Sequence, residues 1–84
     1  MPSPREEYDR VFLESFALEQ SQLGPELVYQ SVKTWDSVGH MSMIAQLEDV
    51  FGIILEMDDI IDFSSYEVGI EILKKYGVNL ETVS

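Results

Sequence analysis

Residues that begin and end helices recur along this chain, and apolar residues three or four positions apart lie between them. "SPRE" (Ser3–Glu6) is a capping box, with serine suited to the N-cap, proline to N1 and glutamate to N3. A second such pair, Ser64 with Glu67, precedes the last apolar run, and Gly52 and Gly77 stand where helices commonly end. No segment alternates long enough to predict a strand. The pattern therefore predicts an all-α fold, a small bundle of three principal helices and one short helix.

The first predicted helix starts at Ser3 and should end near Glu19. Its inner face consists of apolar residues at helical spacing: Tyr8, Val11, Phe12 and Phe16. A long connection, "SQLGPELVYQSVKT", follows it and is centred on Gly24-Pro25. Connections of this length are often functional. We expect three apolar side chains of this connection to fold back onto the core, namely Leu23, Leu27 and Val32.

The second predicted helix begins at or just after Asp36-Ser37, and either residue is suited to the N-cap. Its apolar stripe is expected to comprise Val38, Met41, Ile44, Leu47 and Phe51, widened by Met43 and Val50. The segment "EMDDIIDF" should form one or two helical turns, with Ile60, Ile61 and Phe63 as its apolar residues. The inner face of the last helix should consist of Tyr66, Ile70, Leu73 and Tyr76.

The charge of the chain restricts its partners. The 84 residues suffice for one domain, spanning residues 1–84, and carry five basic against sixteen acidic side chains, a net charge of −11. Such a surface repels nucleic acids and anionic membranes and attracts basic protein patches. No apolar run is long enough to span a bilayer, and the polar start "MPSPREEY" does not resemble a secretory signal. We expect a cytoplasmic monomer that binds proteins.

Residue sets typical of enzymes and metal centres are missing. The chain has no cysteine and one histidine, His40, which we interpret as an ordinary surface residue. Hence the sequence predicts neither catalytic residues nor a metal centre. Four acids do fall in a calcium-loop register: Glu56, Asp58, Asp62 and Glu67. In that register Ile60 replaces a ligand and Ile61 replaces the turn glycine, which argues against calcium binding.

The stretch "DSVGHMSMIAQLEDVFGI" (residues 36–53) resembles the signature of acyl carrier proteins, in which Asp-Ser-aliphatic precedes a helix that ends in an acidic pair and Phe-Gly-Ile. The whole chain is also similar to this family in the expected order of its helices. The resemblance implies that Ser37 is esterified with 4′-phosphopantetheine, donated by coenzyme A through a separate phosphopantetheinyl transferase. The thiol of that arm would carry acyl groups as thioesters, so Ser37 is an attachment point and the chain is not an enzyme.

The resemblance also implies a surface for partner enzymes with basic patches, such as acyl-loading ligases or synthases. The matching positions, with two further apolar candidates, are Asp36, Val38, Met41, Ala45, Glu48 and Asp49. Gly39 and Ser42 stand where carriers of fatty-acid synthesis usually have acids. This departure favours a specialised polyketide, nonribosomal peptide or polysaccharide-tailoring pathway over general fatty-acid biosynthesis. Two alternatives remain open: a carrier-like acidic interaction module without a prosthetic group, and a calcium-responsive helical protein.

Overall fold

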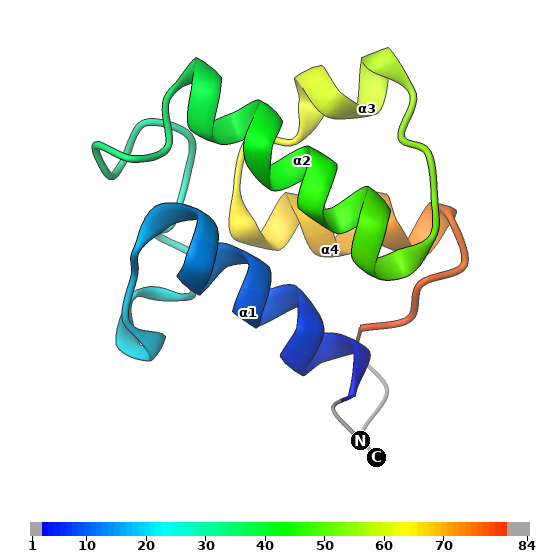
Figure 1. Cartoon of the computed structure of the whole chain (residues 1–84), viewed down its shortest axis with the longest axis horizontal. Coiled ribbons are helices and arrows are strands. Elements are labelled where there is room, and N and C mark those ends of the chain that lie inside the picture. The colour runs from blue at the N-terminus through cyan, green and yellow to red at the C-terminus, as the bar shows by residue number, and fades with distance from the viewer. Residues whose placement is uncertain (1–2, 81–84) are drawn as a thin grey trace.

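Four α-helices and one short 3-10 helix make up the regular structure of residues 3–80, which the computed structural model describes (Figure 1). The elements are α1 (Pro4–Phe16), η1 (Gln20–Gln22), α2 (Ser37–Phe51), α3 (Met57–Asp62) and α4 (Tyr66–Lys75). Between residues 3 and 80 the one strand-like feature is an isolated antiparallel bridge that joins Val28 to Ser65. The predicted all-α bundle of three principal helices and one short helix is confirmed.

Two helix boundaries differ from the prediction because local capping decides them. Helix α1 ends at Phe16, short of Glu19, because Ala17 adopts a left-handed φ of 54° and its N–H bonds the carbonyl of Leu13. Helix α4 is capped by Ser65 and not by Ser64, since the Ser65 hydroxyl accepts the N–H of Val68 at 3.0 Å. The first cap is confirmed at Ser3, which accepts the N–H of Glu6 at 3.3 Å.

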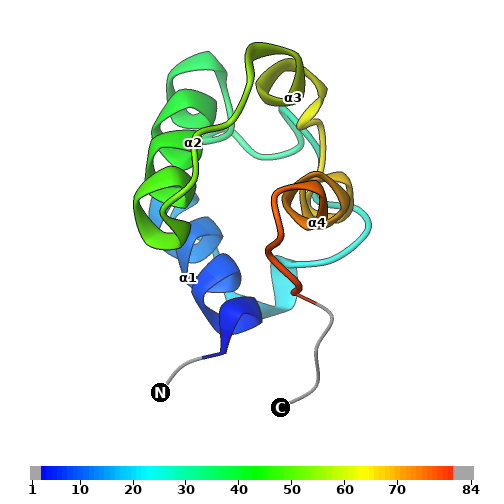
Figure 2. The same ribbon diagram turned by 90° about the vertical axis from the view of Figure 1, so that its right-hand side faces the viewer.

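The helices enclose one core. Helices α1 and α2 pack side by side, α4 lies behind them in Figure 1, and α3 lies across one end between α2 and α4 (Figure 2). Aromatic side chains dominate the centre, where Phe12 contacts the rings of Tyr8, Phe16, Trp35 and Tyr66 at centroid distances of 4.9–5.7 Å. This burial supplies the apolar contact on which so small a domain depends.

The inner face of α2 is narrower than its sequence suggests. Met43, Ile44 and Leu47 are buried, whereas Val38 is 80% exposed and Met41 52% exposed. Phe51 and Val50 are half-buried at the edge of the core. The prediction that Val38 and Met41 belong to the inner stripe is wrong. Val38 precedes Leu47 by about two and a half helical turns and so lies on the opposite side of α2, and Met41 lies beside residues of α3.

The connection between α1 and α2 folds back as expected. Leu27 is buried, and Leu23 and Val32 pack against the core. Two backbone hydrogen bonds tie this connection to the start of α4, from Tyr66 N–H to the Leu27 carbonyl at 2.9 Å and from Tyr29 N–H to the Ser64 carbonyl at 2.8 Å. The segment that precedes Ser37 is therefore fixed in place against another helix.

Candidate functional site

The structure separates the roles of the two residues at the start of α2. Asp36 is the N-cap: its backbone is extended and its Oδ1 accepts the N–H of Gly39 at 2.8 Å. Ser37 is the first helical residue and is exposed. Because the carboxylate already caps the helix, the hydroxyl of Ser37 is not needed for that purpose.

The hydroxyl of Ser37 has a neighbour from the long connection. The phenol oxygen of Tyr29 lies 3.3 Å from Ser37 Oγ, and either atom can be the donor. The ring of Tyr29 meets the rings of Trp35 and His40 edge to face, at centroid distances of 6.4 and 5.6 Å. A side chain eight positions earlier in the chain thus reaches the exposed serine.

A groove of about 350 Å³ opens beside Ser37 between α2 and α3. Ser37, Tyr29 and Ser64 are the hydroxyl-bearing residues of its wall. The rest of the lining is made by His40 and by apolar side chains, namely Met41, Met57, Ile60, Ile61 and Phe63. An apolar group attached at Ser37 would find apolar surface directly next to its attachment point.

His40 joins α2 to α3 at this groove. The indole N–H of Trp35 donates to His40 Nδ1 at 2.9 Å, and His40 Nε2 lies 2.8 Å from the carbonyl oxygen of Ile60. An indole N–H can only donate, so Nδ1 accepts and Nε2 carries the proton that is donated to Ile60. The prediction of an ordinary surface residue is wrong, because His40 is partly buried and both ring nitrogens have protein partners.

On its other side, α3 is attached to α4 through Asp59. The Asp59 carboxylate accepts hydrogen bonds from Lys75 Nζ at 2.6 Å and from the Tyr76 hydroxyl at 2.5 Å. These bonds, from Lys75 first and then Tyr76, lower the pKa of Asp59 below its usual value. Conversely, the bond to Asp59 raises the pKa of Lys75 and of Tyr76. The groove wall formed by α3 is consequently held from two directions, by His40 and by Asp59.

Five of the six residues predicted to meet partners are exposed on α2 or at its cap. They are Asp36, Val38, Met41, Ala45 and Asp49. Glu48 differs, because it is partly buried and its Oε2 accepts the N–H of Leu55 at 2.9 Å. Its carboxylate holds the turn between α2 and α3, a role that the sequence did not reveal. The partner role of all six residues stays a prediction.

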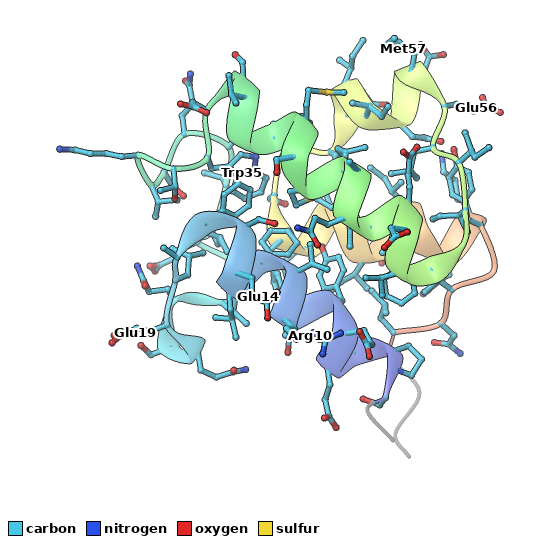
Figure 3. All side chains as sticks on the ribbon, viewed as in Figure 1. Arg10, Glu14, Glu19, Trp35, Glu56 and Met57 are labelled. Carbon is cyan, nitrogen blue, oxygen red and sulfur yellow. The ribbon has the colours of Figure 1, made fainter. Side chains whose placement is uncertain are left out.

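Further apolar side chains extend this surface beyond α2. Ile54 is 84% exposed, Met57 68% and Ile61 70%. Figure 3 shows Met57 and Glu56 pointing outward at the start of α3, whereas Trp35 points into the interior between α1 and α2. Exposed acids occur in the same part of the chain, namely Asp49, Glu56, Asp58 and Asp62. Exposed apolar side chains interspersed with carboxylates suit a partner surface that combines apolar and basic side chains.

Of the residues in the calcium-loop register, Asp58 and Asp62 lie on α3 and Glu67 lies on α4. Within residues 3–80, no three His, Asp or Glu side chains are grouped so that they could hold a metal ion. Among the described residues, no helix is long and apolar enough to cross a membrane.

Sequence reasoning missed Tyr29, Trp35 and His40 as parts of this site. One signal was available: Trp35 and His40 occupy the N′ and N4 positions around the Asp36 cap, where a hydrophobic staple forms. Nothing in the sequence indicated that Tyr29 reaches Ser37. Comparisons with protein-family models, curated proteins and solved structures found no match for the chain.

Proposed function

We propose that this chain is a stand-alone acyl carrier protein that bears 4′-phosphopantetheine on Ser37. The observation that carries the proposal lies at the start of α2, where Asp36 caps the helix and the Ser37 hydroxyl stays exposed. This arrangement falls within the Asp-Ser-Val motif that resembles the acyl carrier signature. A serine needed for capping would be a poor attachment point.

The residues present fit a phosphodiester at this position. The first N–H groups of an α-helix have no intrahelical acceptor, and the helix dipole favours negative charge there. Asp36 uses one of these donors, that of Gly39, so those of Ser37 and Val38 are not used by the cap. When bound, the prosthetic group supplies a thiol that carries acyl groups as thioesters. Ser37 holds the group, and the apolar groove beside it offers a place for attached apolar groups.

The exposed face of α2 and α3 accounts for the partners that a carrier needs. Asp36 and Asp49 supply negative charge, and Val38, Met41 and Met57 supply apolar contact area. Exposed ion pairs contribute roughly 0.2–1 kcal/mol each, so several of them steer a partner without holding it permanently. We infer as partners a phosphopantetheinyl transferase and acyl-loading ligases or synthases with basic patches. The protein would act in the cytoplasm as a monomer and non-enzymatic shuttle, in fatty-acid synthesis or a specialised pathway.

Loading tests this proposal directly. The purified chain is incubated with coenzyme A, magnesium and a broad-specificity transferase, and its mass is measured before and after. We expect the mass to increase by one phosphopantetheine, with the modification mapped to Ser37 and absent from Ser37→Ala. An unmodified product under conditions that load an established carrier would overturn the proposal and favour the carrier-like interaction module instead.

A further inference from the structure

We propose that Tyr29 is a positioning residue for the group carried by Ser37: its phenol donates a hydrogen bond to the phosphate once that phosphate is attached. This inference rests on the proposed function and adds to it a residue outside the Asp-Ser-Val motif. It starts from the 3.3 Å separation between the Tyr29 hydroxyl and Ser37 Oγ.

The surroundings of Tyr29 hold its ring in place. Its backbone N–H bonds the Ser64 carbonyl at 2.8 Å, which fixes this part of the connection to the start of α4. The rings of Trp35 and His40 meet it at interplanar angles of 88° and 79°. Both rings belong to the hydrogen-bonded pair that adjoins the first turn of α2. The phenol oxygen is therefore directed at Ser37 by contacts with two other elements.

Attachment fixes which of the two oxygens donates. It forms a bond from Ser37 Oγ to phosphorus and breaks a pyrophosphate P–O bond of coenzyme A. Adenosine 3′,5′-bisphosphate leaves, and the hydroxyl proton passes to a base of the transferase. Ser37 Oγ then has no proton, so the Tyr29 phenol is the remaining donor of the pair. A phosphate oxygen is the stronger acceptor, because hydrogen bonds to ionised groups are shorter and stronger than neutral ones.

The charge of the chain makes a neutral donor at this position valuable. The chain has a net charge of −11, and the carboxylate of Asp36 stands next to Ser37. A phosphodiester attached there is stabilised by a hydrogen bond from the phenol, which adds no further negative charge. Because Tyr29 also lines the groove, this bond would hold the first atoms of the arm at the groove's mouth.

The test compares wild type with Tyr29→Phe, which keeps the ring and removes only the hydroxyl. Tyr66→Phe is the matched control, since it removes a phenol that bonds Asp9 and Arg5 on α1. Each protein is loaded with coenzyme A by a broad-specificity transferase, and its mass and circular dichroism confirm loading and folding. Phosphorus NMR then records the chemical shift and line width of the phosphodiester, with the urea-unfolded loaded protein as reference.

We expect the phosphorus resonance of the wild type to be displaced from the unfolded reference. Tyr29→Phe should lose that displacement and show a narrower line, while Tyr66→Phe keeps the wild-type resonance. Loaded Tyr29→Phe with the wild-type shift and line width would overturn the role of Tyr29 and leave the carrier function standing. If no variant accepts the group at Ser37, the mass shows it, and the carrier function fails together with this inference.

Discussion

The indole N–H of Trp35 donates to Nδ1 of His40 across 2.9 Å, one turn away from the exposed serine of α2. The two rings are nearly parallel, at an interplanar angle of 14°. Trp35 precedes the Asp36 cap and His40 is the fourth helical residue, so the pair occupies the staple positions of the helix start. Through Nε2 the same histidine reaches Ile60 and thereby connects the cap of α2 with α3.

Replacing His40 by phenylalanine should lower the free energy of unfolding. The Trp35 N–H and the Ile60 carbonyl would both lose their partner, and a buried polar group left unsatisfied costs about 1–3 kcal/mol. Urea unfolding followed by the fluorescence of Trp35 measures the loss. His40→Gln is the control, because its amide offers one acceptor and one donor and should lose less. A phenylalanine variant as stable as the wild type would show that water satisfies these groups.

Because Asp36 is the N-cap, replacing Asp36 should lower the stability of the fold more than replacing Ser37. Asp36→Ala removes the acceptor of the Gly39 N–H and should cost about 0.5–2 kcal/mol. Ser37→Ala removes an exposed hydroxyl and should change stability by less than about 0.5 kcal/mol, while abolishing loading. Thermal unfolding of both variants checks the contrast. If Ser37→Ala were the more damaging change, the hydroxyl would be structural and the attachment role would lose its main support.

Gly39→Ala should destabilise the protein, although alanine is the better helix former by about 1 kcal/mol. A Cβ on Gly39 would lie 2.0 Å from the carbonyl oxygen of Thr34 and 3.2 Å from the ring of Phe16. The backbone must move to accept it, and overpacking of this kind costs about 1–3 kcal/mol. Ser42→Ala, at an exposed position of the same helix, is the control and should be neutral or slightly stabilising. A melting temperature for Gly39→Ala at or above that of the wild type would contradict this packing.

The sequence predicts the helices of this fold better than it predicts their faces. Caps and apolar spacing are local features of a helix. The roles of Ser3, Asp36 and the apolar residues of α1 could therefore be predicted without knowing which segments pack against them. Which face of α2 is buried depends on the elements that pack against it, and Val38 and Met41 lie outside that face. The Tyr29–Ser37 contact depends likewise on a connection anchored to α4. Ser37, the proposed attachment residue, was thus identified from a local motif, whereas its neighbours required the tertiary structure.

Acid should weaken the attachment of α3 to α4 through Asp59. Hydrogen bonds from Lys75 and Tyr76 lower the pKa of Asp59 below its ordinary value of 3.8. A lowered pKa in the folded state means that the stabilisation is present above pH 3.8 and is lost as the pH falls through the folded-state value. Urea unfolding at a series of pH values measures this effect. As the pH falls, the free energy of unfolding should decrease more steeply for wild type than for Asp59→Asn, and the two values should converge at the acid end. Asp58→Asn replaces an exposed acid on the same helix and is the control, which should show the pH dependence of the wild type. The same pH dependence of unfolding for wild type and Asp59→Asn would contradict the role of Asp59.

Reversing the charge of the α2 acids should have separable effects on recognition and on folding. Asp49 is exposed, so Asp49→Lys should leave stability within about 0.5 kcal/mol and slow the transfer of phosphopantetheine. The defect should lie in the association rate and shrink as salt rises, because screening weakens the attraction to a basic partner. Glu48→Lys should in addition destabilise the fold, since its carboxylate accepts the N–H of buried Leu55 and holds the turn before α3.

Transfer rates at low and high salt, with unfolding curves for each variant, distinguish these two effects. A slower transfer by Asp49→Lys without loss of stability identifies α2 as part of the partner surface. Glu48→Lys alone could not show this, because a displaced turn would also move Ile54 and Met57, the exposed apolar residues that follow it. If Asp49→Lys leaves the rate and its salt dependence unchanged, the basic partner docks elsewhere. The exposed acids of α3, Asp58 and Asp62, would then be the next to reverse, because α3 forms the other wall of the groove beside Ser37.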